Sequence, residues 1–594
     1  MFSSNSSMYK MMRITVGFLG LCLLLLTACG GRQEEHPIDF HYTDITEEAG
    51  IDFVHEKPVF DSKVDRIMPW LASTGAGVFT ADYDQDGYMD LYMINSARGS
   101  LNHLYRNLGD GTFEEVGEVA GVADVNQEGV SETALWFDYN NDGYPDLFVG
   151  TWSSESKLFE NNQDGTFTDV SEATGLSPLV GNFNKAVAID YDRDGWLDLY
   201  VGGYFHEQHN MFALTTTRIM HNDFERARNG GRNVMLRNEG GTFTDVSDAL
   251  GVADTGWTLA VGAADVNQDG WTDLYNANDF GADTFYLNEK GQRFRQVVQS
   301  RGIGEDTFKG MNVDFADVFH DGRLAMYVTN VSKPLYILEG NQLWHEDESG
   351  TYVDRSIEMG IQLADFSWGA RFFDADNKGE FSLAVATGFI SASKKRDYWF
   401  DLGTLATTPG TIVEDADNWM DFEDKSLSGY EQSYLFWNDG NRFSNVAAQA
   451  GITFDSDSRG VAPVDLDNDG DLDLVFANQG TSPNVYQAEV NPDHHWIKLK
   501  LTGTMPSNRD AVGARVTFEV GGTKTVMERD GGNSHGAQAD PRLHFGLDDA
   551  ERVDRITIQW PSGRVQVLEN VQADQILSVM EPDTPLPVSD EEQR

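Results

Sequence analysis

The chain has few cysteines and few basic residues. Among 594 residues there are two cysteines, Cys22 and Cys29. Cys22 lies in an N-terminal segment that we expect to be removed, so the mature chain would keep one cysteine and could form no internal disulfide. Lys and Arg number 43 against 96 Asp and Glu, which gives a formal net charge of −53. Such a negative field repels polyanions, and we therefore expect no nucleic-acid partner.

The N-terminal apolar run is too short to favour a membrane-spanning helix. It covers residues 16–26 and leads into Leu-Thr-Ala-Cys at residues 26–29. A short apolar run before Leu-x-Ala-Cys resembles a bacterial lipoprotein signal. We therefore expect residues 1–28 to be removed, Cys29 to be lipidated and residues 29–37 to form a tether. The protein would then be exported and attached to a membrane through its N-terminal lipid, in the outer membrane, on the periplasmic side or at the cell surface. The alternative is an ordinary signal peptide followed by an unmodified cysteine.

The chain also lacks the common catalytic motifs. It contains no P-loop, dinucleotide fingerprint, haem-attachment motif or nucleophile elbow. We therefore do not expect an enzyme. A calcium-dependent polysaccharide lyase or hydrolase is an alternative, and it would need a proton-transfer pair beyond the ion ligands. The nearest polar constellation, which could also hold a transition metal, comprises His206, Glu207, His209 and His221. A solvated loop is the simpler interpretation of these residues.

The main repeated feature is an acidic loop with the pattern D-x-[DN]-x-D-G-x-x-D. It begins at Asp82, Asp138, Asp190, Asp265 and Asp465. Side-chain oxygens at positions 1, 3, 5 and 9, a carbonyl at position 7 and a glycine at position 6 are what a calcium ion with about six to eight ligands requires. The sequence therefore predicts about five Ca²⁺ sites. The predicted ligands are Asp82, Asp84, Asp86, Tyr88, Asp90, Asp138, Asn140, Asp142, Tyr144, Asp146, Asp190, Asp192, Asp194, Trp196, Asp198, Asp265, Asn267, Asp269, Trp271, Asp273, Asp465, Asp467, Asp469, Asp471 and Asp473.

These loops differ from EF-hands. An EF-hand places a bidentate Glu at position 12 and a helix on each side. Position 12 here is never Glu, and the flanks are short apolar stretches such as residues 91–94 and 474–476, which are typical of buried strands. Each loop is therefore predicted to be a turn that connects two strands and binds an ion.

Two further copies of the loop are degraded. The copy at Asp317 has lost its third and ninth ligands, and the copy at Asp374 has Lys378 at position 5 and Ser382 at position 9. A lysine at position 5 could place its ammonium where the ion would be. We interpret both copies as repeats that kept the turn and lost most or all of the metal. The glycines at position 6 of all copies are Gly87, Gly143, Gly195, Gly270, Gly322, Gly379 and Gly470.

A second signature, aromatic-x-x-[VI], alternates with the loops. It begins at Phe113, Phe167, Phe243, Phe294 and Phe443, and in an altered form at Tyr352. A further copy at Phe40 precedes every loop, whereas the last loop has none after it. A closed ring accounts for the extra strand at Phe40 and for the strand missing after the last loop, because the N-terminal strand can complete the last repeat. The prediction is an all-β chain with a seven-bladed β-propeller over residues 38–490.

Long insertions fall on the side of the repeats away from the ion loops. They lie near residues 52–72, 202–233 and 391–432, and we expect them to cluster. Long excursions inside compact repeats are often functional, so a protein or glycan ligand is predicted on this face. The insertions carry the aromatic residues Trp70, Tyr204, Phe205, Phe212, Trp399, Phe400, Trp419 and Phe422. The alternative is that these aromatics only pack the insertions against the ring.

A different pattern begins after residue 490. Strand-like runs at residues 496–501, 514–520, 553–560 and 563–567 predict a small all-β domain over residues 491–581, with a disordered acidic tail at residues 582–594. The segments N-R-D-A-V-G-A-R-V, D-P-R-L-H-F-G-L and I-Q-W-P-S-G, which begin at residues 508, 540 and 558, resemble the ASPIC/UnbV domain. The acidic repeats resemble the FG-GAP/VCBS class of integrin α-subunit propellers.

Together the two parts are similar to bacterial relatives of cartilage acidic protein. The resemblance implies an extracytoplasmic calcium-binding protein, with adhesion or matrix interaction proposed for animal members, and it supplies no catalytic residues. The leading hypothesis is a lipid-anchored binding or adhesion module in which calcium is structural. A scaffold subunit of a membrane complex is a third hypothesis.

Overall fold

Strands make up most of the secondary structure of the described chain. The structure is a computed structural model that describes residues 36–297, 302–303, 307–333, 337–397, 403–405 and 411–583. The predicted signal segment 1–28, the lipidation site Cys29 and residues 584–594 of the predicted tail lie outside these residues. Residues from Phe40 onward form one unit of contacts, separate from Met1–Asp39. In the described ranges, no helix has both the length and the apolar character needed to cross a membrane.

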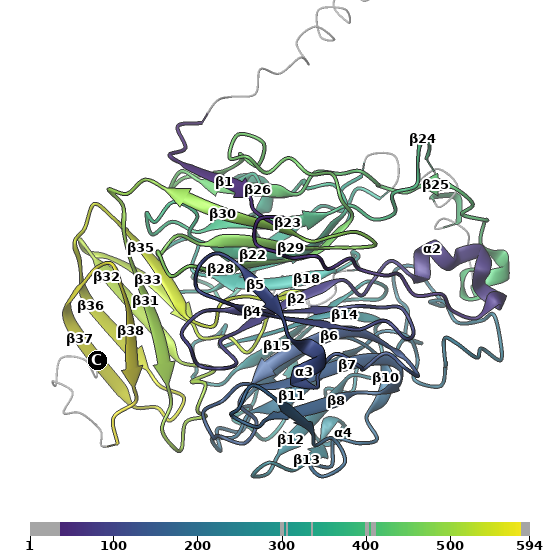
Figure 1. Ribbon diagram of the computed structural model, residues 1–594, viewed down its shortest axis with the longest axis horizontal. Coiled ribbons are helices and arrows are strands. Elements are labelled where there is room, and N and C mark those ends of the chain that lie inside the picture. Colours follow the sequence, from purple (N-terminus) through teal and green to yellow (C-terminus); the bar gives the residue numbers. More distant parts are fainter. Residues whose placement is uncertain are drawn as a thin grey trace, which may run out of the picture. The chain divides into compact units, whose positions relative to one another are not determined.

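The acidic repeats form antiparallel groups of four strands (Figure 1). Two neighbouring groups are joined where β10 pairs with β7. This arrangement is consistent with a β-propeller. The groups are β2–β5 (Gly77–Ala81, Asp90–Ile94, His103–Asn107, Phe113–Glu115), β6–β9 (Val130–Phe137, Asp146–Glu155, Lys157–Asn161, Phe167–Asp169), β10–β13 (Val180–Ile189, Asp198–Gly203, Val234–Asn238, Phe243–Asp245), β14–β17 (Thr258–Ala264, Asp273–Asn278, Thr284–Asn288, Phe294–Gln296), β18–β21 (Asn312–Ala316, Ala325–Thr329, Gln342–Glu346, Tyr352–Asp354), β22, β23, β26 and β27 (Ser367–Phe373, Ser382–Thr387, Tyr434–Asn438, Phe443–Asn445), and β28–β30 (Ser458–Val464, Asp473–Asn478, Asn484–Val490) with β1 (Phe40–Asp44).

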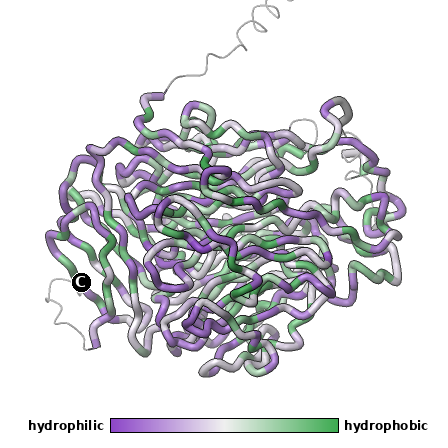
Figure 2. Tube along the Cα trace, viewed as in Figure 1, coloured by the Kyte–Doolittle hydropathy of each residue, from purple (hydrophilic) through white to green (hydrophobic). Residues whose placement is uncertain are grey.

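The first two strands of each group are more buried than the fourth. In the β2–β5 group the first two strands are buried at every residue, whereas β5 buries only Phe113. This difference explains the two sequence signatures. Continuous apolar runs flank the acidic loops because those strands have both faces covered. The aromatic-x-x pattern marks an outer strand with one buried side chain. Figure 2 shows hydrophobic stretches alternating with hydrophilic ones along the chain.

The N-terminal strand completes the last group, as the sequence predicts. β1 pairs antiparallel with β30 from Phe40 opposite Val490 to Asp44 opposite Tyr486. The buried Tyr42 hydroxyl also donates to the Leu472 carbonyl oxygen at 3.2 Å. The two ends of the repeat array are therefore held together by a strand ladder.

Short helices follow three of the outer strands. They are α3 (Gly117–Ala120), α4 (Ser247–Leu250) and α5 (Ser356–Met359). Each ends at a glycine in the left-handed conformation, with φ of 85° at Gly121, 78° at Gly251 and 82° at Gly360. Glycine occupies these positions because it adopts positive φ without steric cost.

The three insertions pack against one another, as predicted. Their short elements are η1 (Ser62–Ile67), α2 (Met68–Leu71), β24 (Ser393–Asp397), η3 (Thr411–Glu414), η4 (Ala416–Asn418) and β25 (Lys425–Ser426). The first insertion meets the second where the Leu214 amide donates to Asp61 Oδ2 at 3.0 Å. It meets the third where Arg66 Nη1 donates to the Trp419 carbonyl at 3.0 Å. One buried apolar cluster spans all three insertions.

The insertion aromatics belong mostly to this cluster. Trp70, Tyr204, Phe205, Trp419 and Phe422 are buried in it, and Phe212 packs against it. This result confirms that these six residues pack the insertions, so they do not form an exposed aromatic surface. Trp399 and Phe400 lie outside the described residues.

The C-terminal part forms two sheets around its own apolar core. The sheets run in the order β35–β31–β38 and β33–β32–β36–β37 and enclose a cluster that includes Ile497, Val516, Phe545 and Ile556. Beyond the predicted strands, the structure adds β33, β35 and β38. The bounds are β31 His495–Thr502, β32 Arg515–Val520, β33 Thr523–Glu528, β35 Leu543–Asp548, β36 Arg552–Gln559, β37 Val565–Gln572 and β38 Gln575–Met580.

One loop of the C-terminal domain, residues 530–540, runs among the acidic repeats. We call it the inner segment. It includes β34 (Ala537–Gln538), which pairs in parallel with β2. It also contacts the first strand of every other group. These contacts join Gln538 to Trp136 of β6, Gly531 to Ala188 of β10, Asn533 to Ala263 of β14, His535 to Asn312 of β18, Asp530 to Arg371 of β22 and Asp540 to Pro463 of β28.

Candidate metal sites

All seven loops share one backbone conformation. The residue at position 4 has a positive φ in each, from 52° at His320 to 62° at Gln268 and Asn468. The glycine at position 6 also has a positive φ in each, from 79° at Gly379 to 99° at Gly470. The degraded loops at Asp317 and Asp374 are included, which confirms that they kept the turn. The loop shape therefore depends on the backbone pattern and persists where ligand residues are lost.

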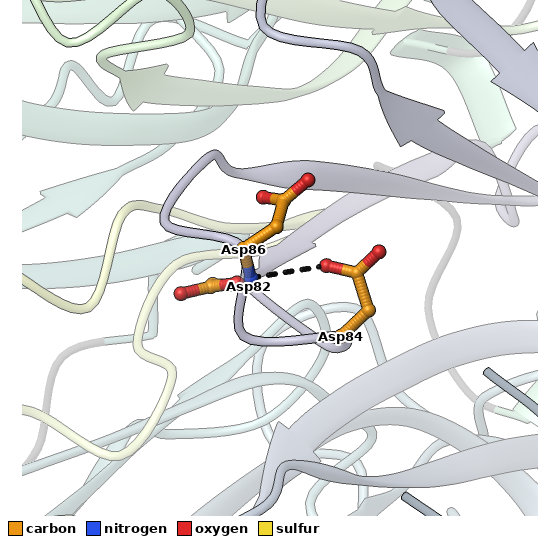
Figure 3. A group of neighbouring side chains, drawn as sticks. All are labelled: Asp82, Asp84 and Asp86. Atoms are coloured by element: carbon orange, nitrogen blue, oxygen red, sulfur yellow. Dashed lines mark hydrogen bonds between the residues drawn. The ribbon is translucent and has the colours of Figure 1, made fainter. Parts of the chain in front are cut away.

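Three loops bring three carboxylates together. In each, one oxygen per residue lies within 4.8 Å of the others. Figure 3 shows the first, in which Asp82, Asp84 and Asp86 surround the turn and the Asp86 amide donates to Asp84 Oδ1 at 3.3 Å. In the described ranges, the groups of this kind are Asp82, Asp84 and Asp86; Asp190, Asp192 and Asp194; and Asp465, Asp467 and Asp473.

The loops at Asp138 and Asp265 carry one carboxylate fewer at position 3. They have Asn140 and Asn267 there, and they are not among the three-carboxylate groups. Their hydrogen bonds nevertheless match those of the others. The amide at position 7 donates to the position 5 carboxylate in all five intact loops, at 2.9 to 3.0 Å. The residues at position 7 are Tyr88, Tyr144, Trp196, Trp271 and Asp471, and their acceptors are Asp86, Asp142, Asp194, Asp269 and Asp469.

The aspartates at position 9 are buried and have a structural role that the sequence did not reveal. Asp90 accepts from the Tyr83 amide at 3.1 Å and from the Asn107 amide at 2.8 Å, so it ties the start of the loop to the third strand. Burial raises the pKa of Asp90 to about 8 and that of Asp146 to about 9. The equivalent residues Asp198, Asp273 and Asp473 are also buried. A cation bound beside these carboxylates would stabilise their charged form.

Several loop carboxylates have an oxygen that accepts no hydrogen bond. In the intact loops these buried atoms are Asp192 Oδ1, Asp273 Oδ2 and Asp465 Oδ1, and the degraded loop at Asp374 also has one, Asp376 Oδ1. A buried carboxylate oxygen without a partner carries a desolvation cost that a bound cation would offset. Hard oxygen donors on one tight turn suit Ca²⁺ or Mg²⁺ better than a soft transition metal. The residues present therefore fit a hard divalent cation.

In the two degraded loops, as in the intact ones, amides of the turn donate to the first aspartate. Asp374 accepts from the Gly379 amide at 2.6 Å and from the Lys378 amide at 3.2 Å. Lys378 Nζ also lies 3.3 Å from Asp376 Oδ2. The lysine at position 5 therefore places its ammonium beside the position 3 carboxylate, as the sequence suggests.

Asparagines at the ends of the third strands connect neighbouring repeats. Asn161 Nδ2 donates to the Tyr83 carbonyl of the preceding loop at 2.9 Å, and Asn238 makes the same bond to Tyr139 at 2.8 Å. Residues at position 4 add a second link, because Asn468 Nδ2 donates to the Gly87 carbonyl at 3.0 Å. The recurrence of Asn before each outer turn was the available signal.

The predicted histidine constellation is only partly assembled. His206 Nδ1 lies 3.5 Å from Glu207, and the ring centroids of His206 and His209 are 6.0 Å apart. His221 is instead fully buried and stacks on Phe280 with centroids 3.6 Å apart. Burial lowers the pKa of His221 well below its usual value. These residues are not among the metal-capable groups of the described chain.

The last loop is covered by Trp496 of the C-terminal domain. A Cβ added at Gly470 would lie 1.8 Å from the Trp496 ring, whereas one added at Gly87 would meet nothing within 4 Å. Both glycines have nearly the same φ, 99° and 98°. We expect Gly87→Ala to cost about 1–2 kcal/mol from backbone strain alone. Gly470→Ala should cost about 1–3 kcal/mol more because Trp496 must move. Urea unfolding measures both, and equal losses would contradict the contact.

Sequence comparisons agree with this architecture. The profile of the FG-GAP-like repeat family matches residues 82–131, 138–201, 265–328 and 415–476. The profile described as ASPIC and UnbV matches residues 503–586. The chain therefore carries FG-GAP-like repeats followed by an ASPIC and UnbV domain. More particularly, it is a distant homologue of cartilage acidic protein 1 over most of its length.

The relatives are divergent in sequence. Cartilage acidic protein 1 of Mus musculus is 21% identical over 94% of this chain and 79% of its own length. The Homo sapiens protein is 21% identical over 85% of this chain and 71% of its own. The Xenopus tropicalis protein is 28% identical over 21% of this chain, and this alignment covers 19% of that protein. A crystal structure of BBS1N in complex with ARL6DN aligns with a TM-score of 0.38 and 8% identity over 70% of this chain and 93% of its own.

Proposed function

We propose that this protein is a calcium-stabilised, seven-bladed β-propeller that serves as an exported, lipid-anchored binding or adhesion module. The blade number is supported by the inner segment, which contacts the first strand of each four-stranded group. Contacts from the first strand of every group to one short segment favour an arrangement of these strands around it. The pairing of β1 with β30 supports closure of the ring.

The observation that carries the calcium assignment is the set of buried loop oxygens without a hydrogen-bond partner, on Asp192, Asp273 and Asp465. Backbone amides also donate to Asp194, Asp269 and Asp465 in the same three loops. These bonds preorganise the loops for a hard cation. We propose five Ca²⁺ ions, one in each intact loop. The ions would be mainly structural, because each links the first two strands of a blade.

The binding role is supported by the cluster of three insertions. Their apolar side chains form a shared buried core, and hydrogen bonds link the first insertion to the other two. Such a surface is preorganised and would lose little conformational entropy on binding a partner. The proposed ligand is a protein or a glycan that binds the polar exterior of these insertions. Membrane attachment would come from the lipid on Cys29.

Two measurements test this proposal. Equilibrium dialysis at millimolar calcium, with elemental analysis, should find about five bound ions per chain. A glycan and protein array probed with the purified protein in calcium and in EGTA should give a ligand, and substitutions on the insertions should weaken its binding. Absence of bound calcium would overturn the structural ion assignment. Absence of any array ligand, or one unaffected by insertion variants, would count against the binding role.

A further inference from the structure

The C-terminal domain contacts the first residue of each of the seven acidic loops. Most contacts involve the carboxylate of that residue, and two involve its backbone amide. The contacts join Lys500 to Asp82, Asp510 to Asp138, Asn508 to Asp190, Glu528 to Asp265, Val526 to Asp317, Gly546 to Asp374 and Lys498 to Asp465. The C-terminal domain therefore docks on the ion-loop face of the repeats.

In four of the five intact loops, the charge of the docking residue is related to the residue at position 3. The loops at Asp82 and Asp465 have Asp at position 3, and each receives a lysine. The loop at Asp190 also has Asp at position 3 and receives the neutral Asn508, while Arg237 lies 3.0 Å from its Asp192. By contrast, the two loops with Asn at position 3 each receive an additional carboxylate.

The two lysines reach their loops because of strand alternation. In β31, Ile497, Leu499 and Leu501 face the core of the C-terminal domain, so Lys498 and Lys500 face the repeats. Lys498 is fully buried, with Nζ in contact with Asp465 Oδ2 and 3.9 Å from Asp540. Lys500 Nζ lies 3.3 Å from Asp82 Oδ2 and remains half-exposed.

The two acids are placed against loop backbones. Asp510 Oδ2 accepts from the Asp138 amide at 2.9 Å, and Glu528 Oε1 accepts from the Asp265 amide at 3.0 Å. The Glu528 side chain is buried, and Arg515 Nη1 lies 3.8 Å from it. Each acid thus adds a carboxylate beside a loop that has an amide at position 3. Each of these loops also receives an arginine, because Arg515 donates to the Asp265 carbonyl at 3.3 Å and a Cβ added at Gly143 would lie 3.3 Å from the Arg509 guanidinium.

We propose that the C-terminal domain forms part of each cation site. The charge of the residue that it places beside a loop sets the cation affinity of that loop. Asp510 and Glu528 strengthen cation binding in the loops at Asp138 and Asp265, and Lys500 weakens it in the loop at Asp82. The reason is Coulombic, because a fixed charge beside a site acts on a doubly charged ion with twice the energy that it exerts on a single charge. This inference rests on the proposed function, since it requires ions in the loops.

The test compares the calcium-binding isotherm of the full chain with those of near-isosteric variants. We expect Asp510→Asn and Glu528→Gln each to weaken one site by about tenfold. Lys500→Gln should tighten one site. The matched controls are Glu519→Gln and Lys524→Gln, which remove the same charges from a pair 3.4 Å apart in the β32–β33 hairpin. They should leave the isotherm unchanged, and melting in EGTA checks that each variant folds.

A double-mutant cycle assigns the effect to a loop. Asp142→Asn weakens the loop at Asp138, so Asp510→Asn should change the isotherm less in that background than in the wild-type chain. The inference is overturned if the acid variants leave the isotherm unchanged, or if Lys500→Gln shifts it in the same direction as they do. A wild-type chain that binds no calcium at millimolar concentration would instead overturn the proposed function, and the inference with it.

Discussion

Removal of calcium with EGTA is expected to lower the melting temperature of the protein by on the order of ten degrees. Each occupied site would stabilise the folded chain by about 2.7 kcal/mol when the ion is in hundredfold excess over its dissociation constant. Several such sites act together, because each loop joins two buried strands. Differential scanning calorimetry in calcium and in EGTA measures the shift.

Substitutions in single loops measure how much each site contributes to the calcium-dependent stability. Asp86→Ala and Asp469→Ala should each remove part of the EGTA-sensitive stability, because each deletes a carboxylate from an intact loop. Asp321→Ala is the matched control, since it removes the same position from the degraded loop at Asp317. It should leave the difference between calcium and EGTA unchanged. A melting temperature that does not respond to EGTA would contradict structural calcium.

Arg371→Met is expected to lower the free energy of unfolding by about 3–5 kcal/mol. Arg371 on β22 lies between Asp314 of β18, at 2.8 Å, and Asp530 of the inner segment. Burial alone would raise the pKa of Asp530, but the Arg371 guanidinium holds it well below its usual value. The Asp530 carboxylate therefore stabilises the folded state at pH values above its unfolded pKa. This stabilisation is lost as the pH falls towards its lower folded pKa. Without Arg371, the Asp314 and Asp530 carboxylates stay buried without the cation that pairs with both of them, while Arg529 and Lys185 still act on Asp530 electrostatically.

Urea unfolding at constant calcium measures this loss. Arg355→Met is the control, because Arg355 pairs with Glu358 on an exposed turn at 2.9 Å. Such a surface pair contributes about 0–1 kcal/mol. The double variant Arg371→Met, Asp530→Asn should recover part of the loss, since it removes one of the stranded charges. Equal effects of Arg371→Met and Arg355→Met would show that the buried network contributes nothing.

The sequence was sufficient for features that repeat locally. The pattern of Asp and Gly located all seven turns, because a left-handed backbone and a capping carboxylate are properties of the loop itself. Phe40 could be paired with the last repeat because that repeat lacked an outer strand, whereas the N-terminus had one outer strand with no loop before it. The aspartates at position 9 show the limit of this approach. Their spacing suggested ligands alone, whereas Asp90 also fixes the next strand.

The predicted histidine constellation also shows the limit of inference from sequence. His206, Glu207 and His209 are close in the chain and remain close in the structure, but His221 stacks on Phe280 in the buried insertion core. Proximity in sequence does not predict proximity across an insertion, because the path of a long loop is decided by what it packs against.

By itself, the sequence determined the repeat, its turns and its strand pattern. Only the tertiary structure showed that residues 530–540 run among the first strands and that Lys498, on an alternating strand, is buried against Asp465. The physical reason is that turns and strand periodicity arise from interactions over a few residues. Docking joins groups that are tens to hundreds of positions apart, and their complementarity in charge and shape becomes visible only when the chain is folded.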